Sequence, residues 1–184
     1  DGHRHVLQKP FFVIAMQNPV EFQGTYSLPE AQLDRFLMRL RMGYPGSEEE
    51  RTILSDQVLS QPIDNITSVI RTNDILRCQE LIRTVHVADR VKDYIVTIIE
   101  STRAHSALNY GCSPRASLAL MRVSQAYAAF QGRDYLLPRD VRDMAVSTLS
   151  HRLALKLQTR AEWEGTEQVV ASILDHLPLK KWEE

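Results

Sequence analysis

PFFVIAMQNPVEFQGTYSLPEAQLDRF, residues 10–36, is the stretch that decides the fold. It begins with an unbroken apolar run, Phe11–Ala15, which predicts a strand buried on both faces, as in parallel sheets that helices cover. The amide Asn18 follows closely. Ligands of open α/β sheets bind at the carboxyl ends of the strands, so this position predicts a ligand-facing side chain. On local grounds alone, a turn at Asn18–Pro19 is the simpler interpretation, because both residues favour turns.

The second half of this stretch predicts a short helix at Pro29–Phe36 that carries an arginine near its end. Pro29 suits the first helical position. Arg35 lies near the C-terminus, where the helix dipole stabilises a cation by about 0.3–1 kcal/mol. Arg35 is therefore either a comfortable surface cation or an arginine finger, which reaches a phosphate bound by a neighbouring subunit. The local sequence leaves both open.

Residues 1–44 contain further segments that need a larger sheet around them. Arg4–Leu7 predicts a short strand, and Leu37–Met42 alternates weakly, as another strand would. The sequence GYPG at 43–46 predicts a break between domains. We therefore expect residues 1–44 to be the C-terminal piece of an α/β core and residues 45–184 to form a separate, all-α domain. The fold class is mainly α.

Apolar residues recur with a helical period of 3.6 through most of residues 45–184. Ser47 with Glu50 resembles a capping box at the first helix start. Thr159–Trp163 is the one segment there that reads as extended. The expected helices are Ser47–Leu59, Asn73–Thr84, one from Asp89, one from Ser113–Pro114, one from Pro138, and Thr166–His176. The expected core residues are Val91, Ile95, Ile98, Ile99, Ala116, Ala119, Leu120, Val123, Tyr127, Phe130, Val141, Met144, Ala145, Leu149 and Leu153.

Arg115 is placed against its local preference. Ser113 suits the N-cap and Pro114 the first helical position, so Arg115 falls in the first turn, beside the positive end of the helix dipole. Free backbone N–H groups, the dipole and a guanidinium together make an anion site. A residue that opposes its local preference indicates a partner. An Arg that bends into solvent is the alternative, and the sequence favours neither.

The composition argues against nucleic acid and membrane partners. The net charge is −1, with 43% hydrophobic and 24% charged residues, so no basic surface is implied. No stretch approaches the length of a membrane span. The cysteines, Cys78 and Cys112, have no metal-like spacing and suit reduced thiols in the cytoplasm. Of 22 basic residues 17 are Arg, which fits phosphate contacts or, equally, GC-rich codon usage.

Candidate metal and triad residues are weak. His3 and His5 could share a strand face, but two histidines without further ligands are usually surface residues, so we expect no metal site. The other histidines are scattered and show no triad pattern. No phosphate-binding loop of the form GxxxxGK followed by Ser or Thr occurs in the sequence.

Taken together, these motifs resemble the MoxR family of AAA+ ATPases. The run FFVIAMQNPVEFQGTYSLPEAQLDRF is close to the family pattern FFVIATQNPxExxGTYxLPEAQLDRF, and SPRASLAL and GRDYLLPRDVRDMA resemble the helical lid domain of the family. The resemblance covers essentially the whole chain. Met16 stands where Thr is common, which we expect to have little effect.

The resemblance implies roles for three residues. Asn18 would be sensor 1, which faces the γ-phosphate, and Arg35 the arginine finger, acting on the nucleotide of the next subunit. Arg115 would be sensor 2, which contacts the nucleotide of its own subunit. Arg39 and Arg41 are nearby cations and alternative fingers. The Walker A and Walker B motifs, with the ligands of Mg²⁺, would lie upstream of Asp1, so the chain alone is expected to be inactive.

The resemblance also implies a function: ATP hydrolysis with Mg²⁺, in a cytoplasmic ring that is expected to be a hexamer, coupled to chaperone-like remodelling or maturation of partner proteins. Proteins with a von Willebrand factor A domain are the partners associated with the family. Two other classes remain open. A non-catalytic helical interaction module predicts no nucleotide-dependent assembly, and a DNA-binding helical domain predicts a clustered basic helix, which the sequence lacks.

Overall fold

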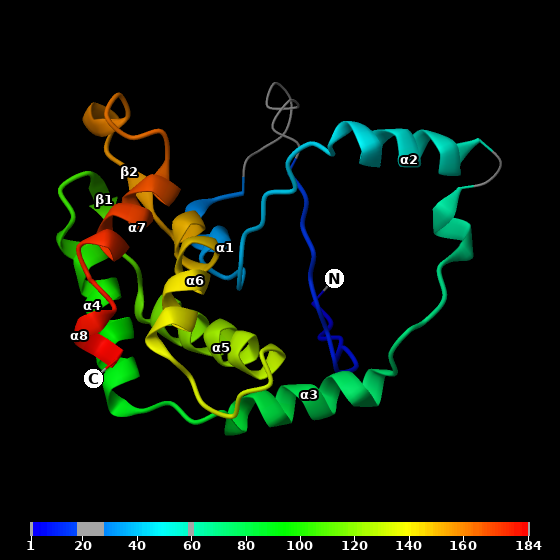
Figure 1. Ribbon diagram of the computed structural model, residues 1–184, viewed down its shortest axis with the longest axis horizontal. Coiled ribbons are helices and arrows are strands. Elements are labelled where there is room, and N and C mark those ends of the chain that lie inside the picture. Colours follow the sequence, from blue (N-terminus) through cyan, green and yellow to red (C-terminus); the bar gives the residue numbers. More distant parts are fainter. Residues whose placement is uncertain (1, 18–27, 59–60, 184) are drawn as a thin grey trace. The chain divides into compact units, whose positions relative to one another are not determined.

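The computed structural model describes residues 2–17, 28–58 and 61–183 (Figure 1). Asn18, the expected sensor 1 residue, lies outside the described residues. The chain forms two compact units, one of Asp1–Phe12 with Leu40–Cys78 and one of Val13–Arg39 with Gln79–Glu184. The second unit therefore joins the segment that carries Arg35 to most of the helical part. The expected division at residue 44 stays a prediction.

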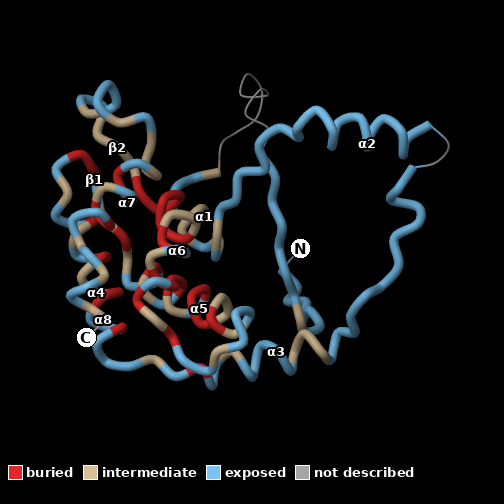
Figure 2. Tube along the Cα trace, viewed as in Figure 1, coloured by how far each residue is buried: buried red, intermediate tan, exposed pale blue. Residues whose placement is uncertain are grey.

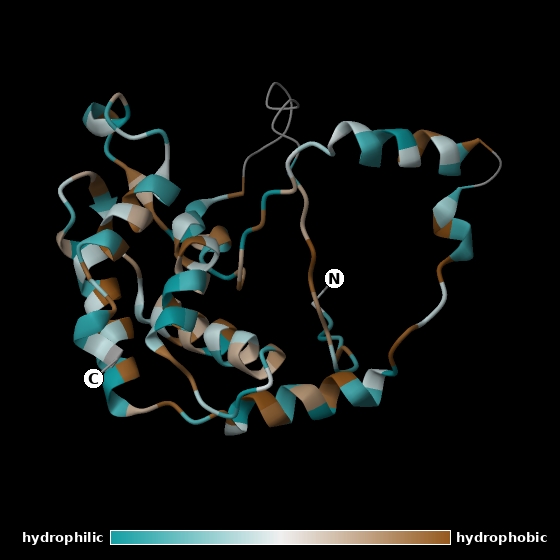
Figure 3. Ribbon diagram, in the orientation of Figure 1, coloured by the Kyte–Doolittle hydropathy of each residue, from teal (hydrophilic) through white to brown (hydrophobic). Residues whose placement is uncertain are grey.

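The first unit holds α2 (Ser47–Gln57), η2 (Pro62–Asn65) and the first half of α3 (Thr72–Thr84). None of these helices buries a residue (Figure 2), although hydrophobic positions recur along α3 (Figure 3). The expected capping box at Ser47 is wrong. The N-cap is Gly46, whose carbonyl accepts the backbone N–H of Glu50 at 2.9 Å. Gly46 makes no side-chain capping hydrogen bond because glycine has no side chain.

The expected strands Arg4–Leu7, Phe11–Ala15 and Leu37–Met42 are not formed. Their described residues lie outside regular structure, and Phe12 and Ile14 are each 78% exposed. A strand exists only when a neighbour accepts its backbone hydrogen bonds. The sheet in the described part of the chain has two strands, β1 (Leu108–Tyr110) and β2 (Ala154–Leu155), which pair antiparallel with each other. The apolar run therefore has no strand to join here.

The second unit is a helical domain with one contiguous core (Figures 1 and 2). Four of its helices confirm the expected ones to within a few residues, because each has the apolar period and a proline or polar start that the sequence predicts: α4 (Asp89–Ala104), α5 (Pro114–Phe130), α6 (Pro138–Leu149) and α7 (Thr166–Asp175). The unit also contains α1 (Glu30–Leu33), which is shorter than expected, and α8 (Lys180–Glu183), which was not expected, with the 3-10 turns η3 (Ser150–Arg152) and η4 (Leu157–Thr159).

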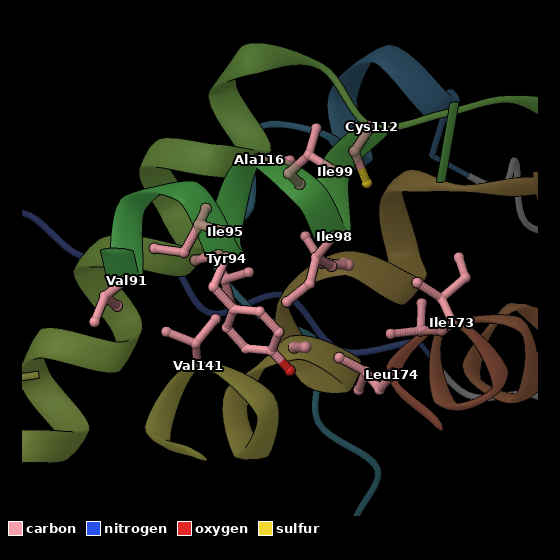
Figure 4. Close-up of a cluster of buried hydrophobic side chains, with 14 of the residues drawn as sticks. Val91, Tyr94, Ile95, Ile98, Ile99, Cys112, Ala116, Val141, Ile173 and Leu174 are labelled. Carbon is pink, nitrogen blue, oxygen red and sulfur yellow. The ribbon is translucent and has the colours of Figure 1, made fainter. Parts of the chain in front are cut away.

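Side chains of α4, α5, α6 and α7 fill the core (Figure 4). Tyr94, Ile98 and Leu120 are fully buried, and so are Val141 and Val169. Three expected core residues differ: Tyr127 and Met144 are half-buried and Phe130 is 88% exposed. Phe130 is the last residue of α5, where the chain turns away at Gly132 with a φ of +73°.

The sequence predicts an extended segment at Thr159–Trp163, and this prediction is wrong. The backbone N–H groups of Glu162 and Trp163 both donate to the carbonyl of Thr159, at 3.1 and 3.2 Å. These local hydrogen bonds close a turn. The segment forms a turn rather than a strand because β2 ends at Leu155, which leaves this segment without a strand to pair with.

One glycine determines how the chain enters α5. A Cβ built on Gly111 would lie 2.4 Å from the backbone N and Cα of Arg103 in α4. Only glycine allows this approach. The close passage of the chain over α4 sets where Ser113 and Arg115 lie at the start of α5.

Candidate functional site

The predicted helix at 29–36 is confirmed for its first turn only. Helix α1 ends at Leu33, and a tight turn follows in which Arg35 and Phe36 donate their backbone N–H groups to Gln32 and Leu33, both at 3.0 Å. Ending the helix early leaves the carbonyls of the following residues free to accept hydrogen bonds from elsewhere. We call residues 34–37 the DRFL turn.

The buried Arg152 of η3 donates hydrogen bonds to these free carbonyl groups. Its Nη1 donates to the carbonyl and to Oδ1 of Asp34, at 2.5 and 2.9 Å, and its Nη2 to the carbonyl of Phe36 at 2.5 Å. Nη2 also lies 3.4 Å from the carbonyl of Leu37, and Nε donates to Thr148 at 2.9 Å. The whole residue is 6% exposed. Arginine is rarely buried unless it is paired, and here every nitrogen of the guanidinium has an acceptor.

His151 supports the same turn. Its Nε2 lies 3.1 Å from the carbonyl of Phe36. Burial is the main effect that lowers the pKa of His151 below its ordinary value. The ring is therefore neutral near pH 7, and Nε2 carries the proton that it donates to Phe36. Two neighbouring side chains of η3 thus hold one turn.

Arg115 lies at the start of α5, in the first turn, as the sequence predicts. Its Nη1 is 3.6 Å from Oδ2 of Asp34, and its side chain is 56% exposed. Ser113 is the N-cap residue but makes no side-chain cap; its hydroxyl donates instead to Oδ2 and Oδ1 of Asp34, at 3.3 and 3.4 Å. The partner that the position of Arg115 indicates is, in this structure, a carboxylate.

Arg35 is exposed and lines a surface pocket with Ala31, Gln32 and Phe36. Within the described residues its guanidinium forms no ion pair or hydrogen bond. Arg35 and Arg115 therefore belong to the same unit, and both are neighbours of Asp34. Arg35 follows Asp34 in the chain, and Arg115 faces the carboxylate of Asp34.

The two alternative fingers are in a different situation. Arg39 forms an ion pair with Glu167 of α7, and its backbone N–H donates to Ser147 at 2.9 Å. Arg41 also takes part in an interaction. The charge of Arg39 is thus already paired, whereas the guanidinium of Arg35 has no partner in the described part of the chain.

Helix α1 is also held from β1. The hydroxyl of Tyr110 donates to Oε2 of Glu30. Desolvation, and then the carboxylate of Glu30, raise the pKa of Tyr110 to about 12. The phenol therefore keeps its proton and its hydrogen bond at any ordinary pH. Contacts at Glu30, Asp34 and Phe36 together fix α1 and the DRFL turn on the helical domain.

Metal ligands do not gather in the described residues. No group of three or more His, Cys, Asp or Glu side chains there is placed to hold an ion. None of the described helices has the length and apolar character that crossing a bilayer requires.

Comparison with known proteins matches both parts of this site. Residues 1–38, which include Asp34 and Arg35, match the family described as "ATPase family associated with various cellular activities (AAA)". Residues 100–173, which include Arg115 and Arg152, match the AAA lid domain. The two sides of the contact between the DRFL turn and the helical domain thus belong to two recognised parts of one kind of protein.

Individual relatives agree. The uncharacterized protein YeaC of Bacillus subtilis is 47% identical over 95% of this chain and 54% of its own length. Chaperone MoxR1 of Mycobacterium tuberculosis is 36% identical over 97% of this chain and 49% of its own length. The chain therefore spans about half the length of the curated relatives that it matches.

A solved structure agrees as well. A crystal structure from Cytophaga hutchinsonii, whose protein is provisionally described as an ATPase, superposes with a TM-score of 0.85 at 35% identity, over 93% of this chain and 55% of that one. Two family matches, named relatives and a shared fold point the same way: this chain belongs to the MoxR family of AAA+ ATPases.

Proposed function

We propose that this chain is the C-terminal part of an ATPase module, and that the whole protein couples ATP hydrolysis to chaperone-like remodelling or maturation of partner proteins. The observation that carries the proposal is the state of two cations. Arg35 has no partner in the described residues, and Arg115 has only a long, exposed contact with Asp34. Both guanidinium groups remain available to a phosphate, and both belong to the same compact unit.

The two arginines are proposed to act on different nucleotides. Arg115, in the first turn of α5, would bind the nucleotide of its own subunit, where the helix dipole and free N–H groups add to its charge. Arg35, exposed at the surface, would act as the arginine finger on the nucleotide of a neighbouring subunit. Such a finger is worth about 10³–10⁵ in rate in related arrangements.

Asn18 is proposed as sensor 1, which would orient the attacking water without adding charge. It lies outside the described residues, so this role rests on the resemblance and on its position after an apolar run. Mg²⁺ would neutralise the phosphate charge during hydrolysis. Its ligands are proposed to lie elsewhere in the protein.

Action in trans requires assembly. We propose a ring, with a hexamer as the expected size, located in the cytoplasm. A protein with a von Willebrand factor A domain is the proposed kind of partner. The name of Chaperone MoxR1 supports the chaperone-like role at the level of the family.

The deciding experiment measures hydrolysis by the full-length protein with Arg35→Ala. Activity should be lost, because the neighbouring active site loses its cation. Mixing Arg35→Ala subunits with subunits that keep Arg35 but carry a disabled Walker B motif should restore part of it. Arg39→Ala is the matched control, since Arg39 is already paired with Glu167. Absence of rescue would exclude action between subunits, and absence of ATP binding by the unmutated protein would exclude the proposal.

A further inference from the structure

The carboxylate of Asp34 is shared between two arginines whose surroundings differ. Oδ1 accepts a hydrogen bond from Nη1 of Arg152 at 2.9 Å, and the Arg152 side chain is 2% exposed. Oδ2 lies 3.6 Å from Nη1 of Arg115, whose side chain is 56% exposed. The first pair is buried and hydrogen-bonded, whereas the second is exposed and longer than a hydrogen bond.

This asymmetry makes one of the two arginines removable. If Arg115 leaves, the charge of Asp34 is still balanced by Arg152, and Ser113 still donates to both carboxylate oxygens. If Arg152 left, a buried guanidinium would be stripped of its partners, which is strongly unfavourable. Asp34 is therefore built to keep Arg152 and to give up Arg115.

A terminal phosphate is the chemistry that would take Arg115 away. It carries more negative charge than a carboxylate and offers three acceptor oxygens, and guanidinium groups bind such oxygens in a bidentate manner. The position of Arg115, at the N-terminus of α5, adds free N–H groups at the same place. A carboxylate that holds Arg115 only weakly is thus a natural competitor of a phosphate.

We propose that Asp34 is a positioning residue that holds Arg115 when no γ-phosphate is bound and releases it to the γ-phosphate when ATP binds. This inference rests on the proposed function and gives Asp34 a part in it. Arg152 keeps the DRFL turn in place in both states. This exchange takes place at Oδ2 of Asp34, the residue directly before Arg35. Binding of ATP by one subunit would therefore change the contacts of the residue next to the proposed arginine finger, which acts on the nucleotide of the neighbouring subunit.

A double-mutant cycle on the full-length protein tests the proposal. The affinities for ATPγS and for ADP are measured for the unmutated protein, Asp34→Asn, Arg115→Ala and the double variant. Asn keeps the size and an acceptor for Arg152 but loses the charge. The ratio of ATPγS to ADP affinity should rise about two- to fivefold in Asp34→Asn, the range that an exposed ion pair accounts for. In the Arg115→Ala background the same change should leave the ratio unaltered.

Glu30→Gln is the matched control, because Glu30 is a carboxylate in α1, just before the DRFL turn, that bonds Tyr110 rather than an arginine. It should not change the ratio. An unchanged ratio in Asp34→Asn, or an equal change with and without Arg115, would overturn the inference. If the unmutated protein binds neither nucleotide, the proposed function fails as well; if it binds and hydrolyses ATP but shows no coupling, only this inference fails.

A second measurement does not depend on the folding of a variant. Crystal structures of the full-length protein without nucleotide and with ATPγS should both contain the Arg152–Asp34 pair. Arg115 should face Asp34 in the first and the γ-phosphate in the second. Contact of Arg115 with Asp34 in both structures, or in neither, would contradict the proposal.

Discussion

Arg152 donates hydrogen bonds to a residue that lies 118 positions earlier in the chain, and Asp34 accepts two of them, one at its carbonyl and one at its carboxylate. The contact joins the turn after α1 to η3, the 3-10 turn that follows α6. Because the guanidinium is buried, its partners cannot be replaced by water when one is lost.

Arg152→Ala should therefore lower the free energy of unfolding by about 3–5 kcal/mol, the cost of breaking a buried, hydrogen-bonded charge pair. Urea unfolding followed by circular dichroism measures it. Arg160→Ala, at an exposed arginine a few residues further on, should change the free energy of unfolding by less than about 0.5 kcal/mol. Equal effects of the two substitutions would show that the guanidinium of Arg152 contributes little.

Gly111→Ala should destabilise the helical domain by about 1–3 kcal/mol, because the added methyl group would meet backbone atoms of Arg103 that cannot move aside. The comparison is Gly165→Ala, where the nearest atom is a carboxylate oxygen of Glu167 at 2.9 Å on a flexible side chain. Thermal unfolding should separate the two substitutions clearly. A melting temperature for Gly111→Ala equal to that of the unmutated chain would contradict the close approach of α4.

Acid should weaken the fold through His151. Burial lowers the pKa of His151 in the folded state, whereas the unfolded chain has a histidine pKa near about 6.5. The unfolded state then binds more protons, so the contribution of His151 is complete above about pH 6.5 and is lost as the pH falls from there toward the lower folded-state pKa. Urea midpoints measured across this range should decline on the acid side.

His151→Gln should reduce that decline, since an amide can donate to Phe36 without titrating. Part of the decline should remain, because burial also lowers the pKa of His105. An identical pH dependence with and without His151 would mean that its ring is accessible to protons in the folded chain.

The two thiols should react very differently. Cys78 is exposed, whereas Cys112 is buried and its pKa is raised, mainly by burial, to about 11. At pH 8 roughly one Cys112 side chain in a thousand would be a thiolate, the reactive form. Iodoacetamide should thus modify one thiol quickly and the second only on unfolding, as mass spectrometry can follow. In Cys78→Ser the fast modification should disappear; its persistence would show that Cys112 is open to solvent.

The helices were predictable from the sequence because they depend on nearby residues. Apolar side chains at a period of 3.6 and prolines such as Pro114 and Pro138 predict where α5 and α6 begin, and the structure confirms both. The strands could not be predicted in the same way, because a strand depends on partner strands that the sequence does not reveal. Phe11–Ala15 has the composition of a buried strand, yet it lies exposed among the described residues.

The candidate site was predictable only in part, because local positions can be predicted from the sequence whereas tertiary contacts cannot. The unfavourable place of Arg115 indicated an anionic partner, but the partner observed, Asp34, is brought close only by the tertiary fold. Arg152 was missed entirely. One signal pointed to it: it lies between the buried residues Leu149 and Leu153, a place where an arginine has to be paired.

The Arg152 contact also decides how this protein can be shortened. A helical domain expressed from residue 45 onward would include Arg152 but lose every described acceptor of its guanidinium except the carbonyl of Thr148. The smallest stable piece therefore has to include residues 30–39, even though a break in the chain's composition comes only after them. The arginine in η3 makes the short helix α1 an integral part of the helical domain rather than a dispensable extension.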